Sequence, residues 1–245
     1  MQAWGMTDTG NVRRMNQDAY QILLLKTGQL LAVVADGMGG AKSGNIASTM
    51  AIDVFTRDVQ KHAKANMTRL EMDRVMTSAA DQANREVYDR SRLAEEFEGM
   101  GTTLVAALIQ PPVVCVINVG DSRCYYINED SIRRVSVDHS LVEYMLRTGE
   151  LTEEAARTYP GRNLITRAVG TEPAVLSDVF FVETGDEGEY ILLCSDGLSN
   201  LLSAQELLAE VQRDHDRSDC CERLVRIAKE RGAPDNVTVV LVSLN

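Results

Sequence analysis

Apolar residues gather in runs of strand length along most of the chain, and these runs come in pairs. Residues 21–36 (QILLLKTGQLLAVVAD) hold two such runs joined by Thr27–Gly28, and residues 102–121 hold two more, separated by Pro111–Pro112. Consecutive strands with short turns pair antiparallel, because parallel neighbours need long crossover connections. Further strands are predicted at 124–136, with a turn at Asn128–Glu129–Asp130, and at 175–183, 189–196 and 237–244.

Helical spacing of apolar residues occurs at 44–62 and about 68–92, and again in two late segments. Three predicted helix starts carry a capping pair: Thr68 with Glu71, Ser203 with Glu206, and Asp219 with Glu222. The last helix is expected to stop near Gly232. In the polar segment 140–170, Ser140 with Glu143 predicts one short helix, which Gly149 ends. The pattern predicts one α+β domain over residues 1–245, with sheets packed together and helices outside.

Composition and charge exclude several classes of function. The formal net charge of −11 argues against a nucleic-acid surface, which needs clustered Lys and Arg. Neither a signal-peptide pattern nor an apolar run of the ~20 residues that a membrane span requires is present, so we expect a cytoplasmic protein without membrane contact. The cysteines are odd in number and are expected to be reduced and structural: Cys115, Cys124, Cys194, Cys220 and Cys221.

Two short motifs suggest phosphate chemistry but lack essential residues. Lys42–Ser43 fits the end of a nucleotide-binding loop, yet Asp36 and Ala41 occupy the two positions where that loop needs glycine. Cys220 and Arg226 have the C-x5-R spacing of cysteine-dependent phosphatases. The segment CCERLVR contains no glycine, however, and is predicted to be helical, so we interpret Cys220 as structural.

Carboxylates recur at the ends of predicted strands. Asp36 and Asp196 each follow an apolar run and precede a glycine, Asp121 follows a third run, and Asp18 and Asp235 stand immediately before strands. Any single Asp–Gly step is more commonly an ordinary turn. Converging carboxylates, however, raise one another's pKa unless cations neutralise them. With only three histidines and no zinc-type spacing, the joint pattern favours an oxygen-ligand site for Mg²⁺ or Mn²⁺.

Eight motifs, taken together and in this order, resemble the metal-dependent protein serine/threonine phosphatases of the type 2C family in their compact bacterial form. The motifs are GNVRRMNQDAY (10–20), VVADGMGG (33–40), GMGTT (99–103), NVGDSR (118–123), DHSLV (138–142), RNLITRAVG (162–170), LLCSDGL (192–198) and APDNVTVV (233–240). The resemblance extends from about residue 4 to the last strand. It implies a four-layer α-β-β-α sandwich, in which helix pairs flank two antiparallel sheets, and hydrolysis of phosphoserine and phosphothreonine in proteins.

The resemblance also implies a centre of two Mn²⁺ or Mg²⁺ ions. Asp36 would bridge the ions, the Gly37 carbonyl would bind one of them, and Asp196 and Asp235 would complete the centre. Asp18 would act directly or through a metal-bound water. A sharp turn at residues 36–39 is expected to bring the carbonyl to the cation.

Further residues receive roles by the same resemblance. Asp121 matches the position of a weaker third ion, which Asn163 would approach. The attacking group would be a water oriented by the ions, without a covalent phosphoenzyme. Arg13 would clamp the phosphate oxygens in bidentate fashion, whereas we interpret its neighbour Arg14 as a solvated surface charge.

Three positions depart from the family pattern. Met38 stands where some members have a histidine assigned as general acid, and His139 is the nearest replacement. A structural histidine, with water protonating the leaving group, is the alternative for His139. Gln17 and Asn45 stand where members often have Glu, which predicts weaker metal binding. Residues 140–170 match the family's variable flap, which is expected to influence substrate choice.

The expected partners are phosphorylated proteins and the bacterial Ser/Thr kinases whose action the enzyme reverses. A non-catalytic binding module on the same fold is an alternative, but it predicts loss of a main metal ligand, and Asp36, Asp196 and Asp235 are all present. A phosphoesterase for small molecules, or a sporulation-type regulator, is a third hypothesis. Turnover of a phosphopeptide compared with a small phosphate ester discriminates it.

Overall fold

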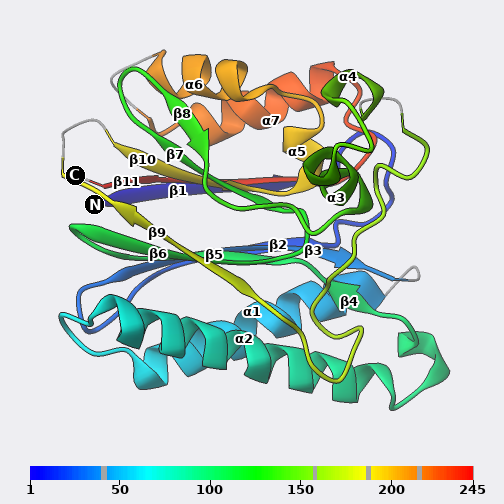
Figure 1. Ribbon diagram of the computed structural model, residues 1–245, viewed down its shortest axis with the longest axis horizontal. Helices are drawn as coiled ribbons and strands as arrows, with labels where there is room; N and C mark the ends of the chain where they lie inside the picture. Colours follow the sequence, from blue (N-terminus) through cyan, green and yellow to red (C-terminus); the bar gives the residue numbers. More distant parts are fainter. Residues whose placement is uncertain (40–42, 157–158, 186–188, 214–216, 245) are drawn as a thin grey trace.

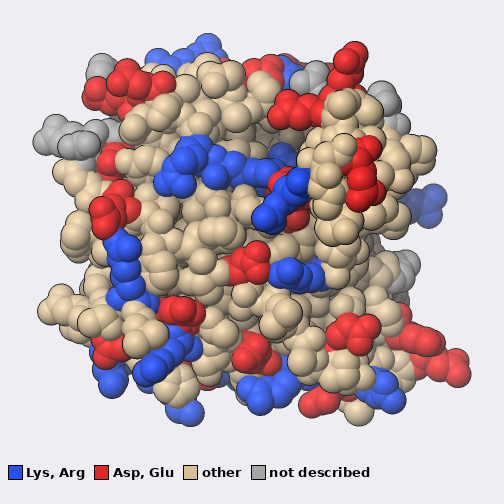
Figure 2. Space-filling model, in the orientation of Figure 1, with Lys and Arg blue, Asp and Glu red and all other residues tan. Residues whose placement is uncertain are grey.

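Two antiparallel sheets pack face to face, and helices cover both outer faces in the computed structural model (Figure 1). The structure describes residues 1–39, 43–156, 159–185, 189–213 and 217–244. These four layers confirm the α-β-β-α sandwich. On the face shown in Figure 2, acidic and basic side chains are interspersed. Among the described helices, none combines the length and the apolar character that crossing a membrane requires.

Sheet I contains five strands in the order β1-β11-β10-β7-β8. Their bounds are β1 Gln2–Asp8, β11 Val237–Ser243, β10 Tyr190–Cys194, β7 Arg123–Ile127 and β8 Ile132–Arg134. The strand β1 is absent from the predicted set. Its sequence QAWGMTD has no clean alternation of apolar and polar residues, and its place in the sheet comes from seven register pairs with β11, at the far end of the chain.

Sheet II has the order β2-β3-β5-β6-β9, and β4 pairs with the end of β3. Its bounds are β2 Asp18–Leu24, β3 Leu30–Met38, β4 Gly101–Thr102, β5 Leu104–Gln110, β6 Val113–Val119 and β9 Asp178–Glu183. The strand β3 is buried on both faces, which explains its continuous apolar run. Leu31 and Val33 face the helices, whereas Ala32 and Val34 face sheet I.

Helices α1 (Ser43–His62) and α2 (Arg69–Ser91) cover sheet II. Sheet I is covered by α5 (Asp196–Ser199), α6 (Ala204–Gln212) and α7 (Cys220–Glu230). Two short helices, α3 (Leu141–Thr148) and α4 (Glu153–Ala156), belong to the predicted flap, and a 3₁₀ turn, η1 (Glu95–Phe97), follows α2.

Most of the predicted helix caps are confirmed. Thr68 and Ser203 form complete capping boxes, Ser140 accepts a hydrogen bond from the Glu143 amide, and Gly149 ends α3 with a left-handed φ of 76°. The predicted cap at Asp219 is wrong. Although α7 begins at the next residue, the Asp219 carboxylate pairs with the Arg223 guanidinium one turn further on and accepts no hydrogen bond as a cap.

Candidate active site

Two of the predicted aspartates lie opposite each other on neighbouring strands. Asp18 begins β2 and pairs in register with Asp36, near the end of β3. Side chains directly opposite on an antiparallel pair share one face, with Cβ atoms about 5 Å apart. Their face is the one that Val34 presents to the other sheet, so both carboxylates enter the space between the sheets.

Sheet I and the end of β6 supply the other three aspartates. Asp196 is the first residue of α5, just after β10, and Asp235 stands two residues before β11, the neighbour of β10. Asp121 follows β6 in sheet II. The strands that carry or flank these aspartates begin or finish at the same end of the sandwich. Five carboxylates from sequence positions 18 to 235 therefore lie close together.

Mutual repulsion shows in the pKa values of this cluster. Burial raises the pKa of Asp36 well above its ordinary value, and the charges of Asp18, Asp196, Asp121 and Asp235 raise it further. Burial likewise raises the pKa of Asp18 to about 6 and the pKa of Asp121 to about 7, with a contribution from Asp196 in both cases. Carboxylates held this close at neutral pH need a compensating positive charge.

Divalent cations fit these residues. Among the residues that the structure describes, two buried carboxylate oxygens, Asp18 Oδ1 and Asp196 Oδ1, have no hydrogen-bond partner. The second oxygen of Asp196 accepts a hydrogen bond from Asn200 at 3.0 Å. The five aspartates offer carboxylate oxygens as ligands, which suits Mg²⁺ or Mn²⁺.

Within the described ranges, no three Asp, Glu, His or Cys side chains stand ready to hold one ion together. Mg²⁺ usually keeps several waters besides one or two carboxylates. The Gly37 carbonyl is a backbone oxygen on the residue after Asp36. A Cβ on Gly44 would lie 2.8 Å from this oxygen and 2.6 Å from the Gln17 side chain, so the close packing here needs glycine at position 44.

The prediction of a turn at Asp36–Gly37 is wrong, because both residues lie inside β3, where Gly37 pairs with Thr102 of β4. Glycine is needed at position 37 for close approach: a Cβ there would lie 2.1 Å from the Gly44 carbonyl oxygen and 2.6 Å from that of Gln17. The left-handed conformation falls on Gly39, with φ of 137°. Ser43 opens α1, and Ala41 and Lys42 lie outside the described residues.

Arg13 lies at the edge of the cluster. Its Nη2 atom is 2.8 Å from Asp235 Oδ2, while about half of its side chain, 55%, remains exposed. Hydrogen bonding to Asp235, together with the charges of Asp235, Asp36 and Asp196, raises the pKa of Arg13. The guanidinium is therefore attached to the carboxylates and still accessible to an incoming anion.

His139 is buried, and both of its ring nitrogens face neighbouring groups. Nδ1 accepts a hydrogen bond from the Gly120 amide at 3.1 Å, so the neutral ring carries its proton on Nε2, which lies 3.3 Å from Asp178 Oδ2 and 3.2 Å from Arg167 Nη1. Burial lowers the pKa of His139. These contacts fix the backbone beside Asp121 and support the structural alternative for His139, not proton donation to a leaving group.

Four other residues were singled out by the sequence motifs, and their surroundings differ. The Gln17 side chain packs on Gly44, and Asn45 Oδ1 is buried without a partner. Met38 ends β3 beside Gly101. Asn163 is exposed in the flap, and no hydrogen bond among the described residues joins it to Asp121.

The flap closes on itself through backbone contacts. Ser140 forms a bridge with Ile165, and the Leu141 amide donates to the Leu164 carbonyl at 2.9 Å. Tyr144 on α3 and Leu164 are exposed by 60% and 58%. Residues 157 and 158 of this segment lie outside the described part of the chain.

Several polar residues that the sequence did not single out support the carboxylates. Thr103 binds the backbone of Asp36, since its Oγ1 accepts from the Asp36 amide and its own amide donates to the Asp36 carbonyl, both at 2.9 Å. Asn236 holds the loop before β2 by bonds to Thr9, Met15 and Gln17. Asn236 directly follows Asp235, and that adjacency was the available signal, whereas the motif that holds Thr103 (99–103) contains no aspartate.

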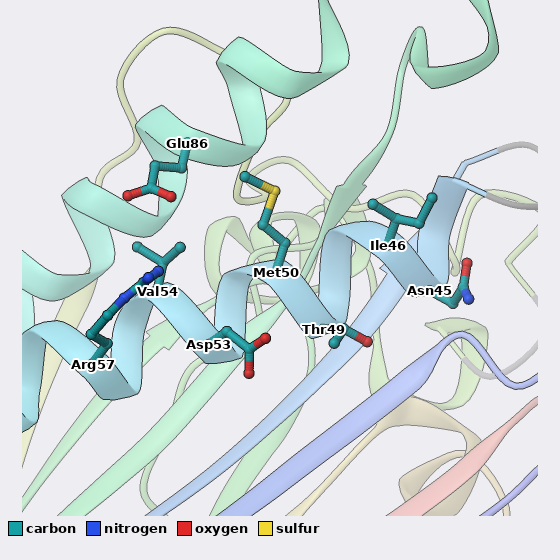
Figure 3. A pocket seen from close by; sticks show the side chains of 8 residues that line it. All are labelled: Asn45, Ile46, Thr49, Met50, Asp53, Val54, Arg57 and Glu86. Atoms are coloured by element: carbon teal, nitrogen blue, oxygen red, sulfur yellow. The ribbon is translucent and has the colours of Figure 1, made fainter.

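A hollow of about 500 Å³ lies along α1, away from the carboxylate cluster. Figure 3 shows Met50 projecting from α1 toward α2, with Ile46 one turn before it on α1, and Glu86 of α2 above Arg57 of α1. The hollow contains no converging carboxylates, and its charged residues are of both signs. The aspartate cluster, none of whose five aspartates lines this hollow, is therefore the candidate reaction centre.

Comparison with known proteins identifies the family. The chain matches the family model for protein phosphatase 2C over residues 11–239. It is 37% identical to the serine/threonine phosphatase stp of Listeria innocua, over 100% of this chain and 96% of that protein. It is 35% identical to the protein phosphatase PhpP of Streptococcus pneumoniae, over 98% and 96%.

Solved structures agree as well. Serine/threonine phosphatase Stp1 from Staphylococcus aureus superposes with a TM-score of 0.91 at 34% identity, covering 99% of this chain and 94% of that one. The Mycobacterium tuberculosis phosphatase PstP/Ppp gives 0.87 at 30% identity, covering 100% and 98%. The chain belongs to the protein phosphatase 2C family.

Proposed function

We propose that this chain hydrolyses phosphoserine and phosphothreonine in proteins at a binuclear Mn²⁺ or Mg²⁺ centre. Family membership, with full-length similarity to proteins named as serine/threonine phosphatases, supports the protein phosphatase activity. The observation that carries the metal centre is the convergence of five aspartates from both sheets. Burial raises the pKa of four of them, Asp18, Asp36, Asp121 and Asp196, and two of their buried oxygens have no hydrogen-bond partner among the described residues.

In this proposal Asp36, Asp196, Asp235 and the Gly37 carbonyl hold the two ions. Asp18 acts beside them, and Asp121 serves a weaker third ion. Divalent ions of this kind supply a nucleophile at neutral pH by lowering the pKa of water, and they stabilise charge on the phosphoryl group.

The protein's own residues orient the substrate. The Arg13 guanidinium, which is already anchored to Asp235, offers its planar fork to two phosphate oxygens. Met38 has no proton to give, and the proton on His139 Nε2 faces Asp178. We therefore assign protonation of the leaving serine or threonine oxygen to water. The flap at 140–170, with Tyr144 exposed, contributes to the choice of substrate.

The proposed setting is cytoplasmic, with phosphoproteins as substrates and Ser/Thr kinases as the opposing enzymes. Residues 1–245 act as one catalytic domain in this proposal. A non-catalytic binding module is not favoured, because the carboxylates that such a module would be free to lose are all present and converge.

Phosphate release from a phosphothreonine peptide tests the proposal. Turnover should require Mn²⁺ or Mg²⁺, stop when a chelator removes the metal, and return when Mn²⁺ is added back, because the proposed attacking water needs the ions to lower its pKa. Comparison with p-nitrophenyl phosphate separates a protein phosphatase from a small-molecule phosphoesterase. Peptide turnover that persists in chelator contradicts the metal centre, and no turnover over a wide range of Mn²⁺ concentrations supports the binding module.

Arg13→Ala should lower kcat/KM for the phosphopeptide about 10- to 100-fold, mainly through a higher KM, because charge-assisted hydrogen bonds contribute about 1.5–3 kcal/mol. Steady-state kinetics at saturating Mn²⁺ measure the change. Arg14→Ala is the matched control, since Arg14 is the exposed neighbouring arginine and should stay close to wild type. Equal losses in both variants would show a general effect of positive charge and no specific clamp.

A further inference from the structure

Two hydroxyl groups from sheet I hold Asp18 by only one of its carboxylate oxygens. Ser195 Oγ and Thr238 Oγ1 each donate to Asp18 Oδ2 at 2.7 Å. All three residues are buried. Asp18 Oδ1 has no hydrogen-bond partner in the described part of the chain, and Asp36 lies opposite Asp18 on the next strand. The carboxylate thus has one oxygen committed to hydroxyls and one oxygen free.

The direction of the hydrogen bonds is determined by the groups around them. The Thr238 amide donates to Ser195 Oγ at 3.0 Å, which leaves the Ser195 hydrogen for Asp18. Asn16 Oδ1 accepts from the Asp18 amide, so the Asn16 amide nitrogen faces Thr7 and donates to its Oγ1 at 2.8 Å.

The hydrogen bond between Thr7 and Thr238 therefore has only one possible direction. Their hydroxyl oxygens are 2.7 Å apart, and Thr238 already uses its single hydrogen on Asp18. The Thr7 hydroxyl must therefore be the donor. A chain of donors runs from Asn16 through Thr7 and Thr238 to Asp18 Oδ2, and each bond polarises the next in the same direction.

This arrangement fixes which oxygen Asp18 presents to the aspartate cluster. With Oδ2 saturated by two short bonds, rotation of the carboxylate would break both of them in a buried setting. Oδ1 is therefore available as a single oxygen donor, to an ion or to a water that an ion holds. Neither hydroxyl is available to touch a substrate phosphate, because both are bonded to Asp18 and buried.

We propose that Thr238 and Ser195 are positioning residues that orient Asp18 and thereby raise the affinity of the centre for Mn²⁺ or Mg²⁺. The inference rests on the proposed binuclear centre. Partners that orient a metal ligand through hydrogen bonds typically contribute about 10- to 100-fold in metal affinity. Thr7 belongs to the same chain of donors and contributes less, because it reaches Asp18 only through Thr238.

Calorimetric titration with Mn²⁺, without substrate, tests the inference apart from catalysis. Thr238→Val keeps the shape and removes the hydroxyl, and it should bind Mn²⁺ about 10- to 100-fold more weakly. Thr238→Ser restores the hydroxyl and should bind close to wild type. Thr56→Val is the matched control, because Thr56 is a buried threonine on α1 whose hydroxyl bonds only to α1 backbone carbonyls, and its loss should leave Mn²⁺ affinity unchanged.

Unchanged Mn²⁺ affinity in Thr238→Val overturns the inference, and so does an equal loss in Thr56→Val. If Thr238→Val does not fold, Ser195→Ala decides, because Ser195 also donates directly to Asp18: weaker Mn²⁺ binding with a normal Thr238→Ser supports the inference, and unchanged binding overturns it. Asp36→Asn tests the metal centre itself, separately from the hydroxyl groups that orient Asp18. Wild-type Mn²⁺ affinity in that variant contradicts the metal centre itself, whatever the hydroxyl variants show.

Discussion

Asp36→Asn is expected to reduce phosphate release from a phosphothreonine peptide by about a thousand-fold or more, which corresponds to about 4 kcal/mol of lost transition-state stabilisation. Asp36 is the residue whose pKa all four neighbouring aspartates raise, so it stands at the middle of the cluster. An amide has nearly the same shape but carries no charge to hold two cations. Phosphopeptide turnover at saturating Mn²⁺ measures the loss.

The fold should survive this substitution. Burial and four nearby charges make an ionised Asp36 unfavourable without cations, so removal of its charge should leave the ion-free melting temperature unchanged or raised. Asp53→Asn, at an exposed position on α1, is the matched control and should retain wild-type turnover. Turnover within tenfold of wild type in Asp36→Asn would show that the Asp36 carboxylate is not an essential metal ligand.

Gly37→Ala should both destabilise the protein by about 1–3 kcal/mol or more and abolish most of the activity. The added Cβ would lie 2.1 Å from the Gly44 carbonyl oxygen and 2.6 Å from that of Gln17. Both are backbone atoms, so no side chain can turn aside to relieve the contact. Either β3 or the start of α1 must move, and both border the carbonyl that the metal centre is proposed to use.

Urea unfolding and Mn²⁺-dependent turnover measure the two effects together. Gly185→Ala is the control, because a Cβ there meets nothing within 4 Å and the residue has no left-handed φ. It should match wild type in both measurements. A Gly37→Ala protein with wild-type stability and activity would show that the end of β3 has more freedom than these contacts allow.

Much of the fold was predictable because its elements have strong local patterns. The paired apolar runs predicted antiparallel strands, and the capping residues at Thr68 and Ser203 marked helix starts correctly. Prediction failed where distant parts of the chain decide local structure. The strand β1 forms through pairing with β11, and Asp36–Gly37 continues β3 because β4 pairs with it beyond the apolar run.

The five aspartates, their places at strand ends, Arg13 and the family could all be predicted from residue identity and order. How these groups face one another depends on the packing of the two sheets. This packing sets His139 against Gly120 and Asp178, and it joins Thr238 to Asp18 across 220 positions of the chain. Such contacts depend on how two sheets pack, and no local pattern of residues encodes that geometry.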